Sequence, residues 1–244
     1  MIIPKQIHET WKPFLTDEIM NELQIIENDI GDNYNPVDPE HILRFMTVDL
    51  DQVRVIWLGQ DVYPMKGVAT GRSFEVGGLE SWQQTFRQVS LKNIVRLLHK
   101  NYNDITDYDN IQSFNEIKKE IKEGTFAIAP PNEWFHKLEE QGVLFLNTSL
   151  TCEVGMPNSH KHIWSLFSQQ VLAYISNRKP EMIWFLWGKE AKETKQYIGS
   201  GVFYESRHPM MCSAKYEDDF LKFTGFAETK DKINWLGIGQ GTLR

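Results

Sequence analysis

Four short runs of consecutive apolar residues stand out along the chain, each bounded by glycine or by polar residues. Apolar side chains at successive positions, rather than at every second position, are typical of strands that are buried on both faces. Such strands occur in parallel sheets that helices cover from both sides. The runs are "VRVIWLG" (53–59), "GVLFLN" (142–147), "MIWFLWG" (182–188) and "GVFYES" (201–206).

The segments between these runs have the periodicity of amphipathic helices. One begins after Thr16, a residue type that favours a helix N-cap, and repeats its apolar residues at Ile19, Leu23 and Ile26. We expect the first fifty residues to be mainly helical. Strands that alternate with helices predict an α/β fold with a central four-stranded parallel sheet flanked by helices on both faces. Further helices are expected at residues 79–102, 161–176, 189–198 and 217–228.

Nothing in the chain of 244 residues marks a domain boundary, since it has no internal repeat, low-complexity tract or Gly/Ser-rich linker. We therefore expect residues 1–244 to form a single domain around one hydrophobic core. No signal peptide is apparent, no apolar run is long enough to cross a bilayer, and the two cysteines, Cys152 and Cys212, are far apart in sequence. These features favour a soluble, cytoplasmic protein without a disulfide framework.

The overall charge limits the ways in which the protein could bind nucleic acid. Its formal net charge is -7 and its pI is about 5.5. A protein that coats nucleic acid non-specifically needs an excess of Lys and Arg to neutralise phosphates, so that class is disfavoured. A local basic face remains compatible with these values.

Polar side chains follow three of the four expected strands. Asp61 comes directly after the first strand, Asn147 ends the second, and His208 follows the fourth. In parallel sheets, ligands bind in the crevice beyond the carboxyl ends of the strands, so these side chains are expected to converge there. Taken singly, each could instead be a turn, capping or surface residue. Their occurrence at equivalent strand ends favours a shared site.

Several kinds of chemistry lack their usual motifs. The chain contains no G-x-G-x-x-G, no G-x-x-x-x-G-K-[ST] and no G-x-S-x-G, which disfavours dinucleotide binding, P-loop phosphate binding and nucleophile-elbow hydrolysis. A metal site at His160 and His162 is also disfavoured, because residues two apart on a helix point to different faces. A carboxylate, an amide, an imidazole and nearby aromatic rings suit recognition of a planar heterocycle.

These motifs resemble those of the family 1 uracil-DNA glycosylases, although the chain would be a divergent member. The motif G-Q-D-P-Y-H appears as "GQDVYP" (59–64), and the family's L-L-W-G-x-x-A-x-K as "MIWFLWGKEAK" (182–192). The family's H-P-S-P-L-S corresponds to "HPMMCSA" (208–214). Segments "GRSFEV" (71–76), "GVLFLNTSLT" (142–151) and "SH" (159–160) occur at the family's spacing. The resemblance extends from about residue 50 to the final "INW" and implies the same α/β fold.

The resemblance implies a monofunctional DNA glycosylase of base excision repair, which flips uracil out of DNA and hydrolyses its N-glycosidic bond. Asp61 would then stabilise the oxocarbenium-like sugar and orient the attacking water. His208, as a neutral ring, would donate a hydrogen bond to uracil O2. Asn147 would read N3 and O4, which excludes cytosine because a mismatched polar group would be left unpaired.

The resemblance also assigns residues that bind the base and the DNA. Gln60 would lie on the turn beneath uracil, Phe74 would stack on the ring, and Tyr63 would exclude the thymine methyl group. The family needs no metal or organic cofactor, and its members usually act on single- or double-stranded DNA as monomers. Contacts to the DNA backbone, or a wedge into the base stack, are implied for Ser90, Ser159, Ser213, Met211 and Cys212.

Several residues depart from the family pattern. Val62 and Pro64 replace the proline and histidine of the first motif, and Cys212 replaces the leucine wedge, so Met211 is an alternative wedge. Arg72 stands where an apolar residue is common. Two other functions therefore stay open. The chain could be a glycosylase retuned to a modified pyrimidine in foreign DNA, or a DNA-binding replication scaffold that needs no catalysis.

Overall fold

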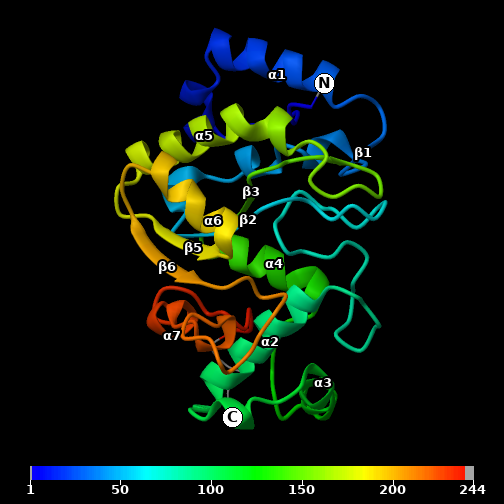
Figure 1. The fold of residues 1–244 in the computed structure, drawn as a ribbon, viewed down its shortest axis with the longest axis vertical. Coiled ribbons are helices and arrows are strands. Elements are labelled where there is room, and N and C mark those ends of the chain that lie inside the picture. Colours follow the sequence, from blue (N-terminus) through cyan, green and yellow to red (C-terminus); the bar gives the residue numbers. More distant parts are fainter. Residues whose placement is uncertain (1, 240–244) are drawn as a thin grey trace.

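A four-stranded parallel sheet forms the centre of the computed structural model, which describes residues 2–239 (Figure 1). Its strands lie in the order β3-β2-β5-β6, and every neighbouring pair is parallel. This confirms the predicted fold class. The strands are β2 (Val55–Gly59), β3 (Val143–Asn147), β5 (Ile183–Trp187) and β6 (Val202–Ser206).

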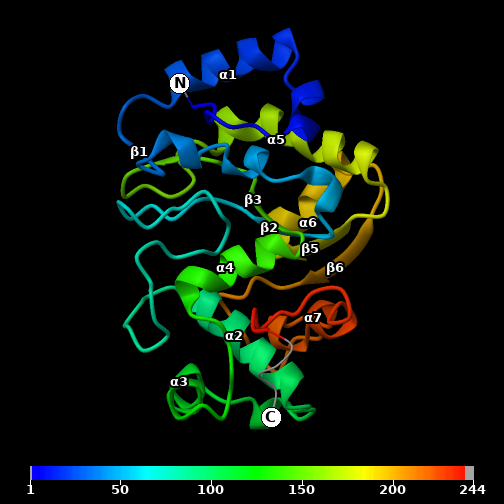
Figure 2. The same cartoon turned by 180° about the vertical axis from the view of Figure 1, so that it is seen from behind.

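Helices cover both faces of the sheet, as Figures 1 and 2 show from opposite sides. Helices α1 and α5 pack over one face, and α2, α4 and α7 over the other. Helix α6 follows β5 directly and contacts it, whereas α3 packs on α2. The helices are α1 (Asp17–Asp29), α2 (Val89–Tyr102), α3 (Phe114–Glu123), α4 (Pro131–Glu140), α5 (Lys161–Arg178), α6 (Lys189–Glu193) and α7 (Gly225–Glu228).

Successive residues of the inner strands enter two different hydrophobic cores, one on each face of the sheet, where the sequence analysis expected a single core. In β2, Val55 and Trp57 pack on the side of α2 and α4, whereas Ile56 and Leu58 pack on the side of α1 and α5. This alternation explains why the strands are apolar at every position. The prediction that each strand is buried on both faces fails only for β6. This strand lies at the edge of the sheet, and its Val202 is exposed.

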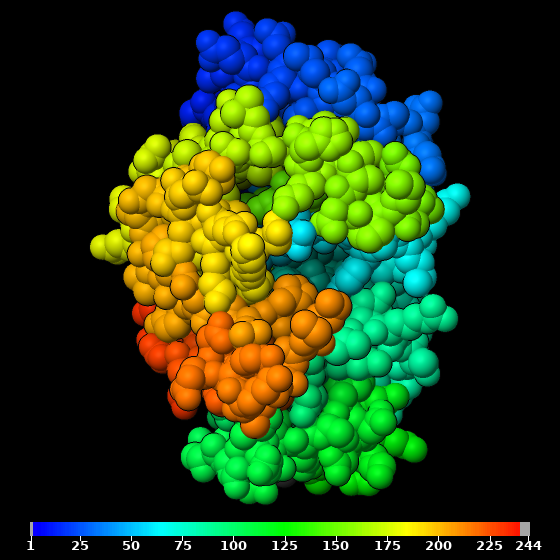
Figure 3. All heavy atoms as spheres, in the orientation of Figure 1, coloured from blue at the N-terminus to red at the C-terminus, as the bar shows by residue number. Residues whose placement is uncertain are grey.

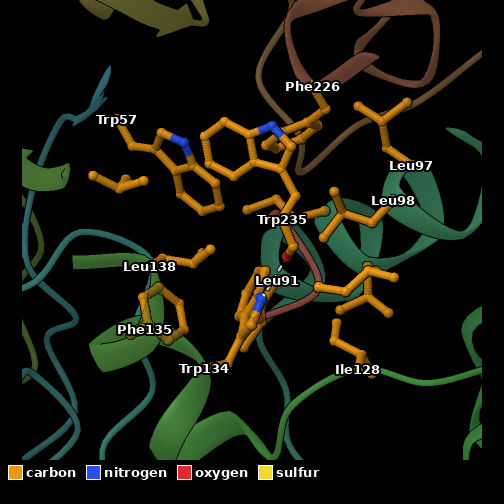
Figure 4. Packing of buried hydrophobic residues seen from close by; sticks show 14 of the residues in the cluster. Trp57, Leu91, Leu97, Leu98, Ile128, Trp134, Phe135, Leu138, Phe226 and Trp235 are labelled. Carbon is orange, nitrogen blue, oxygen red and sulfur yellow. Dashed lines mark hydrogen bonds between the residues drawn. The ribbon is translucent and has the colours of Figure 1, made fainter. Parts of the chain in front are cut away.

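Aromatic packing anchors β2 beneath the carboxyl edge of the sheet (Figure 4). The fully buried Trp57 stacks on Trp235, with ring centroids 5.6 Å apart. The indole N–H of Trp134 donates to the carbonyl of Trp235 at 2.7 Å, which ties α4 to the C-terminal segment. Complete burial of one such ring contributes roughly 1.5–3 kcal/mol or more to the free energy of folding. This packing therefore holds β2 firmly in place.

Three expected helices are shorter than predicted. The helix expected from residue 79 begins only at Val89, because Trp82 and Phe86 pack into the core from a loop, and the Trp82 indole donates to the carbonyl of Ala129. The expected helix 217–228 is reduced to a 3-10 turn at Phe220–Lys222 and the short α7. Helix α6 likewise continues only as a 3-10 turn, Thr194–Tyr197.

The N-terminal part is helical only in places. Thr16 caps α1 as predicted, because its side chain accepts a hydrogen bond from the N–H of Ile19. Most of the remainder consists of 3-10 turns and loops, so the expectation of a mainly helical segment was too broad. A small sheet was not anticipated: β1 (Tyr34–Asn35) pairs antiparallel with β4 (Cys152–Glu153). Across residues 2–239, no helix is long and apolar enough to cross a membrane.

Candidate active site

The carboxyl ends of β2 and β3 approach each other very closely. A Cβ atom on Gly59 would lie 2.2 Å from Oδ1 of Asn147 and 2.9 Å from Cβ of Ser73, so only glycine fits there. The turn is fixed further because the carbonyl of Gln60 accepts hydrogen bonds from the N–H of Ser149 and from the hydroxyl of Thr148, each at 2.9 Å. Because Gly59 has no side chain, the ends of β2 and β3 can approach closely, and the site residues predicted at these two ends lie near each other.

Asp61 lies in this turn with its carboxylate partly buried. One oxygen, Oδ2, accepts a hydrogen bond from the backbone N–H of Asn158. The other, Oδ1, is buried and has no hydrogen-bond partner within residues 2–239. Burial raises the pKa of Asp61 above its usual value, and nearby donors oppose that effect, first the N–H of Asn158 and then the Ser149 hydroxyl and the N–H of Val62. One oxygen of Asp61 is thus hydrogen-bonded and the other is enclosed without a hydrogen bond within residues 2–239.

Asn158 was not singled out from the sequence, yet it contacts two predicted site residues. Besides bonding Asp61, its side-chain Oδ1 accepts a hydrogen bond from Nε2 of Gln60 at 2.9 Å. Its φ of +62° places it in the left-handed region, which Asn tolerates better than most residues. Its position next to the predicted Ser159 and His160 was the available signal.

Phe74 occupies a conformation that is rare for a bulky residue. Its φ is +65°, and such strain persists only where surrounding contacts enforce it, often at functional sites. The preceding Ser73 donates its hydroxyl to the carbonyl of Trp57 at 3.0 Å. The Phe74 ring lies with its centroid 5.2 Å from that of Trp187 and 6.2 Å from that of His208. Phe74 therefore links the ends of β2, β5 and β6.

A narrow cavity lies between four of the predicted residues. Asp61, Tyr63, Phe74 and Asn147 all line it, and its volume is about 10 Å³. Asn147 is only 4% exposed, and its amide forms no hydrogen bond within the described residues 2–239. Tyr63 is partly buried beside it, and desolvation raises the pKa of its hydroxyl. The cavity has room for about one water molecule, so a larger ligand must displace part of its wall.

His208 faces this group from the end of β6. Its Nδ1 accepts a hydrogen bond from the backbone N–H of Met210 at 3.1 Å, so a neutral ring carries its proton on Nε2. Burial lowers the pKa of His208, which favours the neutral form. Gly188 passes so close that a Cβ there would lie 3.0 Å from Cβ of His208. Nε2 is consequently a hydrogen-bond donor at a fixed place.

The serines expected to contact DNA lie in three separate segments, in α2, before α5 and after β6. Ser159 is hydrogen-bonded locally, accepting from the N–H of Glu153 and donating to the carbonyl of Met156. Ser90 is buried in the first turn of α2, and Asn93 in the same helix donates to the carbonyl of Pro209. The start of α2 is therefore close to the loop that holds Ser213.

The two candidate wedge residues differ in exposure. Met211 is 74% exposed, whereas Cys212 is partly buried and packs against the core. The Cys212 thiol lies 3.7 Å from the carbonyl of Pro209, consistent with a weak hydrogen bond. Of this pair, Met211 is the side chain that is exposed to solvent.

Arg72 does not present a free charge to the cavity, although it contributes to the lining. Its side chain is 6% exposed and forms a two-point ion pair with Glu139 of α4, with Nε to Oε1 at 3.0 Å. It also bonds Glu75 at 3.2 Å. The guanidinium is thus held by two carboxylates, which ties the loop of Phe74 to α4.

Of the two histidines considered as metal ligands, His160 is held by a contact within the protein. Nδ1 of His160 lies 2.8 Å from the hydroxyl of Thr151, and burial lowers the pKa of His160. Within residues 2–239, no group of three or more His, Cys, Asp or Glu side chains could hold a metal ion.

Comparison with known proteins finds extensive similarity. The chain is 30% identical over 235 residues to the uracil-DNA glycosylase of Borrelia duttonii, covering 92% of each sequence. It is 30% identical over 241 residues to that of Francisella philomiragia, covering 92% of this chain and 98% of the relative. No family model matches the chain.

Two solved structures share the fold. The crystal structure of mimivirus uracil-DNA glycosylase matches with a TM-score of 0.66 and 18% identity, over 93% of this chain and 83% of that one. The wild-type UNG structure from Nitratifractor salsuginis matches with a TM-score of 0.64 and 23% identity, over 84% and 85%. At these identities the likeness shows the fold alone.

Proposed function

Since the chain belongs to the uracil-DNA glycosylase family, we propose that it is a DNA glycosylase of base excision repair that removes uracil. It hydrolyses the N-glycosidic bond of a nucleotide flipped out of DNA and leaves an abasic site. One observation carries this proposal. A carboxylate, an amide and an imidazole lie around the aromatic ring of Phe74, at the carboxyl edge of the sheet.

His208 and Asn147 form hydrogen bonds with the departing base. As the glycosidic bond breaks, negative charge develops on the uracil ring, and Nε2–H of His208 donates a hydrogen bond to O2. The Asn147 amide, which has no partner of its own within residues 2–239, pairs with N3 and O4. Cytosine presents a donor where uracil has O4, so it would leave buried polar groups unpaired. Fixed donors need no reorganisation as charge develops.

Asp61 acts on the sugar and the attacking water. Its ionised carboxylate stabilises the positive charge of the oxocarbenium-like sugar. Oδ2 is held by Asn158, while Oδ1 is available to accept a hydrogen bond from the water that attacks C1′. The backbone of Gln60 and Asp61 forms the floor under the base.

Tyr63 and Phe74 determine which ring fits. Phe74 stacks on the pyrimidine, and the bulk of Tyr63 leaves no room for a methyl group at C5. The cavity of about 10 Å³ is smaller than a pyrimidine, so part of its wall moves when the base enters. Such induced fit rejects bases that cannot contribute enough binding energy to open the pocket.

The DNA itself is held around this pocket. Ser90, Ser159 and Ser213 bond phosphates on either side of the flipped nucleotide, and these contacts set register without reading sequence. We assign the wedge to Met211 because Cys212 is packed against the core. The protein acts as a monomeric single domain in the cytoplasm, on both single- and double-stranded DNA.

The two other functions find less support. The retuned pocket was suggested by Arg72, but its charge is neutralised by Glu139 and Glu75 rather than offered to a base. A scaffold that needs no catalysis would not require the arrangement of Asp61 and His208.

A substrate panel tests the proposed function. We would measure base release from oligonucleotides that carry uracil, thymine, cytosine or 5-hydroxymethylcytosine, in single and double strands. We expect release of uracil only. The variant Tyr63→Ala is expected to gain thymine release, and Tyr63→Phe, which keeps the bulk, is the matched control. Release of the modified cytosine without uracil would overturn the proposal in favour of the retuned pocket.

A further inference from the structure

Arg72 and Thr70 form a wall between two cavities. Figure 3 shows where the surface is hollowed, between the cyan turn after β2, the yellow α6 segment and the orange loop after β6, and His208 lines this hollow. Thr70 and Arg72 line the narrow base cavity of about 10 Å³ instead, and the same two residues line another cavity of about 260 Å³. With open space on both sides, packing alone does not fix the segment 70–75.

Side-chain hydrogen bonds close this segment around Phe74. The hydroxyl of Thr70 donates to Oε2 of Glu75 at 2.5 Å. The guanidinium of Arg72 donates to both oxygens of the same carboxylate, at 3.2 and 3.3 Å. Phe74, with its strained φ of +65°, lies between the residues that these bonds join. The bonds therefore fix the backbone on both sides of the aromatic ring.

The other side of the guanidinium ties this segment to α4. Nε and a terminal nitrogen of Arg72 donate to the two carboxylate oxygens of Glu139, with Nε at 3.0 Å. A planar guanidinium can bond one carboxylate at two points and still reach a second one, which an apolar side chain cannot do. Helix α4 is in turn bonded to the C-terminal segment through Trp134. We call Arg72, Glu75 and Glu139 the clamp.

Stability alone does not explain a buried ionic cluster at this place. The side chains of Arg72, Glu75 and Glu139 are only 6%, 10% and 17% exposed. Removing such charges from water is costly, and well-packed apolar residues at the same positions often stabilise a fold equally well. The clamp adds a single defined arrangement of the segment 70–75, because the N–H groups of a guanidinium point in fixed directions.

On the basis of the proposed glycosylase activity, we propose that Arg72 is a positioning residue, which through the clamp holds Phe74 in the orientation that stacks on the flipped pyrimidine. Arg72 acts through the Phe74 ring and not on the glycosidic bond. Asp61 and His208 accept hydrogen bonds from backbone N–H groups outside the clamp, so they stay in place without it. The clamp therefore affects binding of the base rather than cleavage of the bond.

Inhibition by free uracil tests this proposal, because it measures the base pocket without contacts to the DNA backbone. The variant Arg72→Met/Glu75→Gln/Glu139→Leu, here the charge-free variant, replaces all three charges by neutral side chains of similar size. Its Ki for uracil and its KM on a uracil-containing single strand should rise about tenfold, the scale of one base–aromatic stack. We expect kcat and the unfolding temperature to stay close to those of the parent.

Further variants connect the effect to the Phe74 ring. The charge-free changes made in a Phe74→Ala background should leave Ki at the value of Phe74→Ala alone, because the ring on which the clamp acts is gone. Glu75→Gln, a change of a single group, should raise Ki in the same direction but less. The matched control is Arg178→Met, which removes a two-point pair with Asp51 before the start of β2, and it should leave Ki unchanged.

The outcomes separate this proposal from the proposed function. An unchanged Ki in the charge-free variant would overturn the positioning role, as would an equal rise of Ki with and without the Phe74 ring. If the charge-free variant does not fold, an unchanged Ki in Glu75→Gln overturns it.

If the parent releases no uracil, the proposed function fails, and crystal structures of the parent and the charge-free variant decide about the clamp. The φ of Phe74 should leave the left-handed region once the clamp is lost, or once Glu75→Gln weakens it if the charge-free variant does not fold. An unchanged φ and ring position would refute the clamp itself.

Discussion

The backbone N–H of Asn158 donates a hydrogen bond to Oδ2 of Asp61, from a loop that lies 97 residues further along the chain. The same residue accepts a hydrogen bond from the side chain of Gln60. Asn158 thus ties the turn after β2 to the loop before α5. It leaves Oδ1 of Asp61 as the oxygen without a partner within residues 2–239.

Substitution of Asn158 should reveal the importance of its left-handed backbone. Asn158→Gly allows the φ of +62° without strain, whereas Asn158→Ala must adopt it at a cost of about 1 kcal/mol. Both variants lose the bond to Gln60. We expect Tm to be lower for Asn158→Ala than for Asn158→Gly, and kcat to follow the same order. Equal Tm values in a thermal scan would contradict this account.

The pH dependence of kcat/KM should reflect Asp61 rather than His208. Activity needs Asp61 ionised, and burial raises the pKa of Asp61, so the acid limb should lie above pH 3.8. Activity also needs His208 neutral, and burial lowers the pKa of His208, so no loss should occur as the pH falls through 6.5. A kcat/KM profile measured from pH 4 to 9 checks both. A fall centred at 6.5 that disappears in His208→Asn would show that His208 titrates normally.

The Arg72–Glu139 pair should contribute strongly to stability. Glu139→Ala leaves a buried guanidinium with only Glu75, and loss of one partner of a buried pair costs about 3 kcal/mol or more. The double variant Arg72→Met/Glu139→Leu removes both charges and should lose less. Urea unfolding measures both free energies. A Glu139→Ala loss below about 1 kcal/mol, the scale of an exposed pair, would contradict this prediction.

The wedge assignment predicts a difference between duplex and single-stranded substrates. Met211→Ala should slow uracil release from duplex DNA about tenfold more than from single strands, because only the duplex imposes an unstacking cost of a few kcal/mol. The control is Cys212→Ala, because Cys212 is next to Met211 but has its side chain packed against the core. The assignment fails if Cys212→Ala shows the larger duplex effect.

Local pattern was sufficient to predict much of the fold. The inner strands are apolar at every position because each residue enters one of two cores, and that leaves a signal in the sequence. The helix at 161–176 has a clear period and was confirmed as α5. The segment 79–88 was mispredicted because burial of Trp82 and Phe86 against distant residues, rather than local preference, fixes a loop there.

The candidate site was predictable only where the residues follow strands or match family motifs. Asp61, Asn147, Phe74 and His208 do so. The sequence could not reveal that Arg72 pairs with Glu139, 67 residues away, or that Asn158 holds Asp61. It also left open whether Met211 or Cys212 points outward. These are consequences of tertiary packing, which local patterns do not encode.

Asp61 supplies the proposed catalytic carboxylate, and one measurement tests this role most directly. Single-turnover release of free uracil from a single-stranded oligonucleotide would be compared for the parent and Asp61→Asn, with binding of the same oligonucleotide measured alongside. We expect the variant to react at least about a thousandfold more slowly, as found for loss of strong transition-state stabilisation, with Kd nearly unchanged. Equal rates for the two proteins would contradict the assigned role of Asp61.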